Sequence, residues 1–412
     1  MVFEGIFFFL FVSLARPFPP PQKPVVISKT DLNEKFLLQV SYEQERGLPD
    51  FMTSRSRIVD FKRQKNVLRM FEEPHDSATP PHLLATIPIR SETPQDLMVD
   101  FNTGFDRVFE EEDRTGEDYD GRADTHDYSF FRISQRQILS VSQRGPMLVL
   151  NQMAIDADME TVLVHYYLSP YRPNPNFKPF EIENLDHFGF YETYPRRRSD
   201  RTLLYAMKFD SQKPIVFALS AAIPDRYRQA MRDGVLYWNK ALGRPLLQVI
   251  DAPDDVTAPS PRYNVIRWLT DGDFASTSHI QGDPLTGEIL HAHIFILSRS
   301  VKHGDLDEQN DHLRYVVAHE VGHALGLRHN FAKGPVSTVM NYFTFKQTVK
   351  IGHDVIRAGG KALDYDRKVM RHVYFGEPLD LDTLPTFCTD GQARCDPLEL
   401  SSPGLSDGTS GD

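Results

Sequence analysis

The chain has 412 residues, of which 40% are hydrophobic and 25% are charged, and its formal net charge is −11. This length accommodates two domains with hydrophobic cores, and the composition is ordinary for a globular protein in water. The acidic balance argues against a nucleic-acid-binding protein, because such proteins normally present a basic face.

The N-terminal residues predict an export signal. Gly5 to Ala15 form an apolar run that is too short to span a bilayer, and Ser13-Leu14-Ala15 offers small residues to a signal peptidase. The residues before this run include Glu4 and no lysine or arginine, so a buried strand or a mis-assigned start is the alternative. We expect a signal peptide at 1–15, a proline-rich linker at 16–30, and a secreted or periplasmic protein without stable membrane insertion.

Residues 31–170 are expected to form a β-rich N-terminal domain, because short apolar or alternating runs are separated there by Pro, Gly and acidic turns. The expected strands are Lys35–Tyr42, Arg57–Phe61, Leu83–Ile89, Met98–Phe101, Ile138–Val141 and Thr161–Leu168. The acidic stretch Glu110–Asp127 misses the spacing of an EF-hand, and we interpret it as a solvated loop rather than a calcium site.

A linker is expected at 171–200, and it ends in the basic run Arg196–Arg198. That run is a protease-sensitive boundary, an anion contact or a solvated basic turn. Cys388 and Cys395 either form a small disulfide loop or remain two free thiols. The Ser/Gly/Asp-rich tail at 398–412 is expected to be disordered.

Residues 201–397 combine strand and helix patterns. The expected strands are Pro214–Leu219, Leu246–Ile250, Val265–Leu269 and Leu290–Leu297, and the expected helices are Pro224–Ala241 and Asp311–Leu325. Phe274–Asp283 is a candidate edge strand above a cleft, where an extended peptide could pair through main-chain hydrogen bonds.

The segment His319 to Asn330 carries the chemistry, with the pattern H-E-x-x-H-x-x-G-x-x-H. On a helix His319 and His323 project from one face, so both imidazoles can bind one metal ion. Glu320 lies beside them, where it can take a proton from a water molecule at the metal.

Gly326 explains how a third histidine can join this pair. A continuous helix would carry His329 about 15 Å along the axis from His319, which is too far for a shared ion. Glycine can adopt the left-handed conformation that ends a helix and reverses the chain. Three histidine ligands leave a fourth position open, which is the catalytic arrangement of zinc.

With this motif the chain resembles the metzincin zinc metallopeptidases. The resemblance implies that His319, His323 and His329 bind Zn²⁺ and that Glu320 is the general base. It also implies that Met340, in S-T-V-M-N-Y, is the methionine of the Met-turn. Tyr342 then occupies the position of a tyrosine that helps to stabilise the tetrahedral intermediate in some branches. The alternative is that this ring is only a packed aromatic residue.

The resemblance covers about Leu32 to Pro397 and is strongest after Lys213. The segments that carry it are Lys213–Phe217, Tyr237–Ala241, Asp251–Asp255, Arg262–Trp268 and Asp283–Ile289. They are similar to a bacterial family of secreted zinc-dependent metallopeptidases with an N-terminal domain of unassigned function. A relative of this metzincin domain is the enzymatic subunit of an AB5-type toxin. The resemblance implies an α+β catalytic domain, in which helices back a twisted mixed sheet and a Met-turn follows.

One departure limits this resemblance. Asn330 follows the third histidine, unlike in the best-known metzincin branches, so their substrate preferences are not carried over.

The function hypothesis is endopeptidase hydrolysis of a protein or peptide substrate. The alternative is a partner-binding protein whose zinc site is inactive or secondary. The N-terminal domain could also act as an inhibitory pro-region. His291 and His293 share a strand face, but no third ligand is evident, so we interpret them as residues of the sheet surface.

Overall fold

The structure is a computed structural model. It describes residues 25–44, 52–73, 80–109, 130–157, 159–182, 189–193, 196–197, 202–253, 262–270, 276–331, 336–357, 359–380 and 384. The predicted signal peptide, the acidic stretch Glu110–Asp127, both cysteines and the predicted tail lie outside these residues. No helix of the described residues is both long and apolar enough to cross a membrane.

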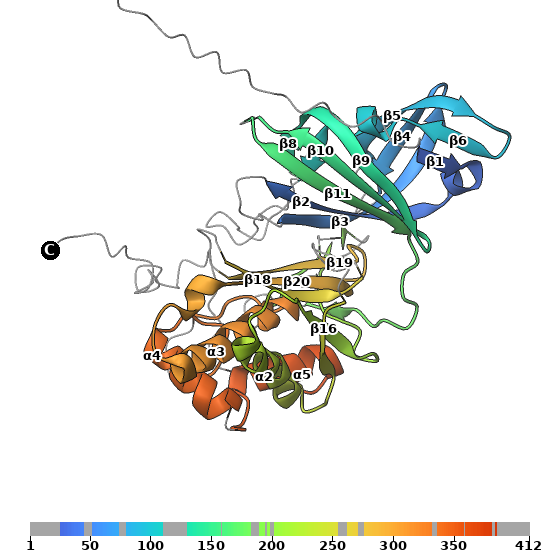
Figure 1. Cartoon of the computed structure of the whole chain (residues 1–412). Helices are drawn as coiled ribbons and strands as arrows, with labels where there is room; N and C mark the ends of the chain where they lie inside the picture. The colour runs from blue at the N-terminus through green and yellow to red at the C-terminus, as the bar shows by residue number, and fades with distance from the viewer. Residues whose placement is uncertain are drawn as a thin grey trace, which may run out of the picture.

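A nine-stranded antiparallel sheet forms the N-terminal part of the molecule (Figure 1). Its strand order is β1-β6-β5-β4-β3-β2-β11-β10-β9. The strands are β1 (Val25–Ser28), β2 (Lys35–Gln44), β3 (Met52–Gln64), β4 (Val67–Glu72), β5 (His82–Glu92), β6 (Asp96–Val99), β9 (Ser134–Arg144), β10 (Met147–Ile155) and β11 (Thr161–Pro170). One face of these strands buries a single apolar core, together with the short helix α1 (Phe101–Gly104). A further pair, β7 (Arg107–Phe109) and β8 (Phe130–Arg132), lies beside the sheet.

This sheet begins earlier than the sequence predicted. Val25 and Ile27 lie in the range expected to be a linker, yet they pair with Val99 and Leu97 and are buried. They point to the same side of β1, because side chains alternate along a strand, so the segment contributes to the core. The expected strand Met98–Phe101 ends at Val99, where the chain turns into α1.

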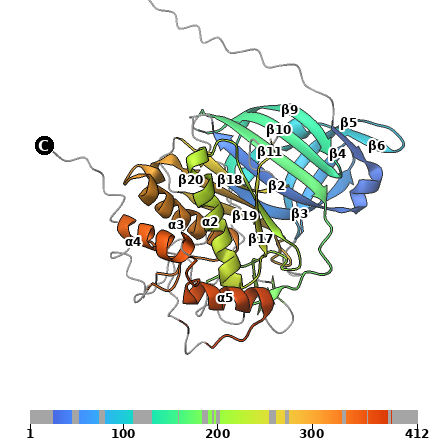
Figure 2. The same cartoon turned by 60° about the horizontal axis from the view of Figure 1, so that its bottom comes forward.

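A five-stranded sheet and several helices form the C-terminal part (Figure 2). The strand order is β17-β16-β18-β20-β19, and all pairs are parallel except that of β19 with β20. The strands are β16 (Ile215–Leu219), β17 (Leu247–Asp251), β18 (Asn264–Leu269), β19 (Thr277–Gly282) and β20 (Ile289–Leu297). The helices are α2 (Asp225–Leu242), α3 (Leu306–Ala324), α4 (Phe345–Ile351) and α5 (Asp364–Phe375), with 3-10 turn η2 (Ser298–Val301) and π-helix η3 (Gly352–Arg357). Mixed helices and sheet fit the expected α+β class.

Helices α2 and α3 lie side by side against one face of this sheet (Figures 1 and 2). One face of α2 is buried, and Trp238 within it donates from Nε1 to the carbonyl of Ala318 at 2.8 Å. Helix α3 begins earlier than expected because Asp305 and Glu308 form a capping box. The capping box stabilises the N-terminus of α3, and the C-terminal half of this helix carries the histidine motif.

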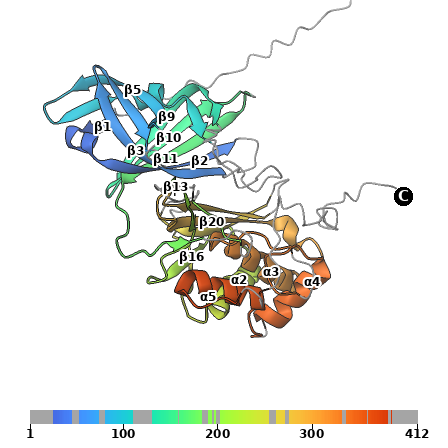
Figure 3. The same cartoon turned by 180° about the vertical axis from the view of Figure 1, so that it is seen from behind.

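The N-terminal sheet covers the other face of the C-terminal sheet, as Figure 3 shows from behind. Strand β3 contacts β19. Leu37 and Ile58 point away from the core of the N-terminal sheet, because they alternate along their strands with Phe36 and Val59 of that core. Both are nevertheless buried. The hydroxyl of Tyr171 donates to Asp283 at 3.0 Å, just after β19.

Histidines line the covered face of the C-terminal sheet. Ala292 and Ile294 of β20 point into the helical core, so His291 and His293 point to the opposite side. His279 of β19 pairs directly with His293 and shares that side. Burial lowers the pKa of His279 and of His291 to about 4 in each case, and it lowers the pKa of His293 well below its usual value.

These histidines predict a loss of stability in mild acid. The unfolded chain binds protons near pH 6.5, whereas His279 and His291 resist protonation in the folded protein until about pH 4. The free energy of unfolding should therefore fall between about pH 6.5 and 4, by up to about 3 kcal/mol per histidine. Denaturant unfolding of the full chain across this range measures the slope.

The variant His279→Gln/His291→Gln should show a shallower slope than the parent chain. The matched control is His353→Gln, because His353 is exposed on the opposite, helical side of the C-terminal sheet. A double variant with the parent's pH slope would contradict the assignment of the acid sensitivity to this face.

Candidate metal centre and active site

The first two predicted ligands lie on the last turns of α3. The Nε2 atoms of His319 and His323 are 3.2 Å apart. Nδ1 of His319 bonds to the carbonyl of Val339 at 2.7 Å, and Nδ1 of His323 bonds to the carbonyl of Leu327 at 2.8 Å. Carbonyl oxygens only accept, so each Nδ1 carries the proton and each Nε2 presents a lone pair.

A chain reversal at Gly326 brings in the third histidine. Helix α3 ends at Ala324, and Gly326 has φ of +103°. A Cβ atom at this position would lie 2.1 Å from the carbonyl oxygen of Met207, so no side chain fits. After the reversal, Nε2 of His329 lies 3.1 Å from Nε2 of His323. The structure thus brings together the three histidines that the sequence singled out.

The three imidazoles fit a zinc ion. Two nitrogens that bind one tetrahedral zinc at about 2.0–2.1 Å lie about 3.3 Å apart, close to the separations from His323 to each of the other two histidines. All three ligand nitrogens lie within 4.8 Å of one another. Nε2 of His319 and Nε2 of His323 both present lone pairs, so their approach to 3.2 Å would be repulsive without a cation between them. Among the described residues, only these histidines form a group of three His, Cys, Asp or Glu with ligand atoms this close. His291 and His293 therefore remain residues of the sheet face, which the N-terminal sheet covers.

Met340 lies beneath the histidines, fully buried against α3. Gly322 makes this approach possible, because a Cβ there would lie 2.2 Å from the Met340 sulfur. The carbonyl of Met340 accepts the backbone N–H of Asn330 at 2.7 Å. The turn that carries Met340 is thus bonded to the segment that follows the third histidine.

Asp366 of α5 fixes this turn from below. Its carboxylate accepts the hydroxyl of Thr338 at 2.5 Å, the backbone N–H of Val339 at 3.0 Å and the hydroxyl of Tyr237 at 2.6 Å. Burial raises the pKa of Asp366 to about 6 despite these three donors. Because Val339 also bonds to His319, the carboxylate orients a proposed metal ligand through the backbone.

Glu320 follows the first histidine and is 5% exposed. Burial raises the pKa of its carboxyl to about 8 in the chain without metal. A divalent cation held by the adjacent histidines would act in the opposite direction, because it favours the ionised carboxylate. The position is suited to a group that exchanges a proton at the metal centre.

Tyr342 lies against the histidines on the open side of the site. Its ring is stacked on His319 with a centroid distance of 5.7 Å, and it lies 4.7 Å from the ring of His329. The side chain is 52% exposed, which differs from an aromatic ring packed into a core. Beneath it, the hydroxyl of Tyr315 donates to the carbonyl of Asn341 and so fixes the turn just before Tyr342.

Part of the expected linker belongs to the metal centre. The backbone N–H of Tyr191 donates to the carbonyl of Gly326 at 2.7 Å, and Phe190 forms a β-bridge with Leu327. The hydroxyl of Tyr191 lies 3.4 Å from Nδ1 of His323. These residues support the turn after α3, although they precede the expected start of the catalytic domain.

Sequence reasoning missed both Asp366 and Tyr191. In the sequence, Asp366 lies in an ordinary segment near a helix N-terminus, and Tyr191 lies in a stretch of mixed polar and aromatic residues. Neither belongs to a local motif, since each reaches the site only through tertiary packing.

The requirement for glycine at position 326 can be tested by Gly326→Ala. Besides the unfavourable φ, the new methyl group would overlap the carbonyl of Met207, so the reversal must shift. We expect a loss of at least about 3 kcal/mol of stability and a reduction of zinc affinity of about 100-fold or more. Chelator competition measures the affinity, and denaturant unfolding measures the stability.

Gly376→Ala is the matched control. Gly376 also follows a helix with a left-handed φ of +70°, but a Cβ atom added there would have no other atom within 4 Å. Gly376→Ala should lower the free energy of unfolding by only about 1–2 kcal/mol and leave zinc affinity unchanged. Equal zinc affinities of the two variants would contradict the role of the close packing at Gly326.

The segment that carries the site matches a known protein family. Residues 304–353 match the model of a protein family described as Met-zincin. No curated protein matches the chain. The matched segment contains α3, the three histidines, Met340 and Tyr342, and it does not extend to the N-terminal sheet. The match and the converging imidazoles together support a metzincin whose three-histidine site fits zinc.

Proposed function

We propose that the chain is a zinc-dependent endopeptidase. The observation that carries the proposal is the convergence of three imidazole Nε2 atoms beside the buried carboxylate of Glu320. A purely structural zinc site normally has four protein ligands and needs neither an open position nor a base. His329 and Tyr342 are the least buried parts of the cluster, so substrate can approach from that side.

His319, His323 and His329 would hold the zinc ion. When bound, zinc supplies a Lewis acid that polarises the scissile carbonyl and makes water acidic enough to react near neutral pH. The chain supplies the orientation of the imidazoles through the carbonyls of Val339 and Leu327.

Glu320 acts as the general base and then as the general acid. Its carboxylate takes a proton from the attacking water and delivers it to the nitrogen of the leaving amine. The low polarity of its buried surroundings favours proton uptake by the carboxylate. Tyr342 donates a hydrogen bond to the oxygen that gains negative charge at the former carbonyl. Its ring is already held beside two of the histidines.

Strand β19 is the proposed binding edge for an extended peptide. Within the described residues it pairs only with β20, so its other edge can form main-chain hydrogen bonds with a substrate strand. The N-terminal sheet lies against the same strand through β3. This contact supports a role of the N-terminal domain in controlling access to the cleft.

A partner-binding protein with an inactive zinc site is the alternative function. Glu320 and the exposed Tyr342 favour catalysis, because a structural or inactive site requires neither. Digestion of a peptide library with and without a zinc chelator separates the two functions: chelator-sensitive cleavage supports the peptidase, and no cleavage by the zinc-loaded chain supports the binding protein.

Glu320→Gln should retain zinc and lose most turnover. The amide has nearly the shape of the carboxylate but cannot accept the proton, so we expect kcat to fall by at least about 100-fold to 10,000-fold. Peptide cleavage is measured together with the zinc content of the purified variant. Undiminished cleavage by the zinc-loaded variant would show that Glu320 is not the base.

Tyr342→Phe tests the second catalytic assignment. Removal of one donor to a developing oxyanion should lower kcat by about 10-fold to 1,000-fold, with little change in KM, because the bond strengthens in the transition state. Phe343→Leu is a neighbouring control that alters an aromatic residue of the same segment. If Tyr342→Phe raises KM and leaves kcat unchanged, the ring binds substrate and does not stabilise the oxyanion.

A further inference from the structure

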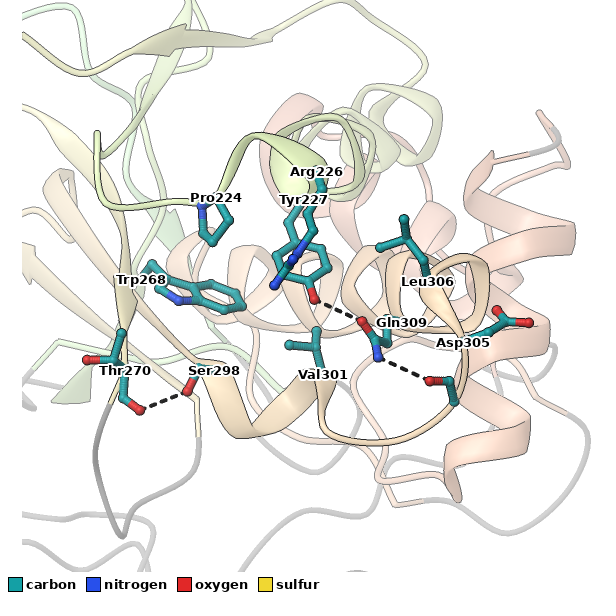
Figure 4. Close-up of a pocket in the computed structure, with 11 residues that line it drawn as sticks. Pro224, Arg226, Tyr227, Trp268, Thr270, Ser298, Val301, Asp305, Leu306 and Gln309 are labelled. Atoms are coloured by element: carbon teal, nitrogen blue, oxygen red, sulfur yellow. Dashed lines mark hydrogen bonds between the residues drawn. The ribbon is translucent and has the colours of Figure 1, made fainter.

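A cavity lies at the far end of α3 from the histidines. It has a volume of about 670 Å³ and opens where β18 and β20 end and where α2 and α3 begin (Figure 4). Leu306 at its rim precedes His319 by thirteen helical positions, which corresponds to about 20 Å along α3. The cavity is therefore separate from the metal centre. The carboxyl ends of parallel strands and the starts of helices are common places for ligands.

Several polar groups of the cavity already have partners within the protein. Asp305 accepts the backbone N–H groups of Asp307 and Glu308 at 3.0 Å each. Gln309 accepts the hydroxyl of Tyr227 at 2.8 Å and donates to the carbonyl of Gly304 at 3.1 Å. Both bonds to Asp305 go to its Oδ1, so its Oδ2 remains an acceptor at the α3 end of the cavity, whereas the amide of Gln309 is bonded through both its oxygen and its nitrogen.

Around Trp268 and the start of α2 the cavity offers hydrogen-bond donors. Trp268 is only 7% exposed, yet its indole N–H has no hydrogen-bond partner among the described residues. Helix α2 begins at Asp225 without a side-chain cap; the N–H of Tyr227 donates to the carbonyl of Pro224 at 2.9 Å, whereas the N–H groups of Asp225 and Arg226 have no partner among the described residues. The guanidinium of Arg226 lies 4.9 Å from the centre of the Tyr227 ring and forms no ion pair within the described part of the chain.

The floor of the cavity is apolar and aromatic. The rings of Tyr227 and Trp268 are stacked, with a centroid distance of 5.4 Å and an interplanar angle of 25°. Leu306 is 49% exposed at the rim, and Val301 also lines the cavity. In Figure 4, Trp268 lies toward one end of the lining and Asp305 toward the other, and Arg226 lies between them. An anionic group is thus favoured at the tryptophan end, away from the Asp305 carboxylate.

We propose that this cavity is an exosite for a peptide segment in which an acidic residue adjoins an aromatic or large apolar one. The carboxylate binds Arg226, the Trp268 N–H and the first turn of α2, and the apolar side chain packs on the aromatic floor. A small inorganic anion would leave that floor empty, whereas the volume accommodates more than one side chain.

The segment belongs to the substrate, and this step rests on the proposed peptidase function. Strand β19 begins beside the same edge of the sheet, since Ser276 accepts the backbone N–H of Leu297 at 3.2 Å and Ser298 lines the cavity. The separation of about 20 Å equals about six residues of extended chain. The exosite would therefore bind residues that lie outside the cleft.

Intrinsic fluorescence gives a direct binding test. The chain has two tryptophans, and Trp238 is fully buried and bonded to Ala318, so a ligand in the cavity changes the emission of Trp268. Titration uses the zinc-loaded full chain carrying Glu320→Gln, with N-acetyl-Phe-Glu-amide and N-acetyl-Phe-Gln-amide as probes. We expect the Glu peptide to bind at least about tenfold more tightly. Equal affinities for the two peptides would overturn the proposal.

Two charge variants locate the binding. Arg226→Gln should weaken binding of the Glu peptide about tenfold, so that the Glu and Gln peptides bind with equal affinity. Lys302 is exposed near the cavity but does not line it. Lys302→Gln also removes one positive charge, and the Glu peptide should still bind more tightly than the Gln peptide. Loss of this difference in both variants would indicate only a general charge effect and would overturn the assignment. Sodium acetate and inorganic phosphate serve as free anions, and binding of either as tightly as the Glu peptide would also overturn it.

A kinetic comparison in the chain with Glu320 intact tests the substrate step. A substrate that carries the Phe-Glu pair about six residues from its cleaved bond should show a lower KM than its Phe-Gln counterpart, and Arg226→Gln should abolish the difference. If the peptides bind but KM does not change, the cavity does not serve the substrate. Absence of any cleavage would contradict the peptidase function and leave the binding result standing.

Discussion

The chain reversal at Gly326 is the constraint on which the metal centre depends. His319 and His323 would face the same side of any helix, but His329 reaches them only because α3 ends before it. The carbonyl of Met207 occupies the space that a side chain at 326 would need. The positive φ and the close packing therefore act at the same residue, and both favour glycine there.

The surrounding structure holds this reversal from two sides. From below, Asp366 fixes the turn that carries Met340, and the carbonyl of Val339 in the same turn accepts a hydrogen bond from Nδ1 of His319. From the other side, Tyr191 bonds to the carbonyl of Gly326. These bonds fix the orientation of the imidazoles through the protein's own backbone, which lowers the reorganisation that metal binding requires. Helix α3 links this centre to the distal cavity as one rigid element.

The sequence predicted those parts of the protein whose signals are local. Helical spacing and the motif identified α2, α3 and the three histidines, and alternating apolar runs located most strands of both sheets. It did not predict that Val25 starts the N-terminal sheet, because the partner strand lies far along the chain. Asp366, Tyr191 and the facing of His279 with His293 depend in the same way on tertiary packing. The roles of Glu320 and Tyr342 in turnover remain predictions.

Zinc-edge X-ray absorption of the purified, zinc-loaded chain tests the convergence of the histidines most directly. One zinc per chain with three imidazole nitrogens at about 2.0–2.1 Å, and with an additional light-atom ligand, is the expected result. In the variant His329→Ala, the coordination shell of the zinc should contain one imidazole fewer. A shell without three imidazoles, or a chain that holds no stoichiometric zinc, would contradict the proposed metal centre.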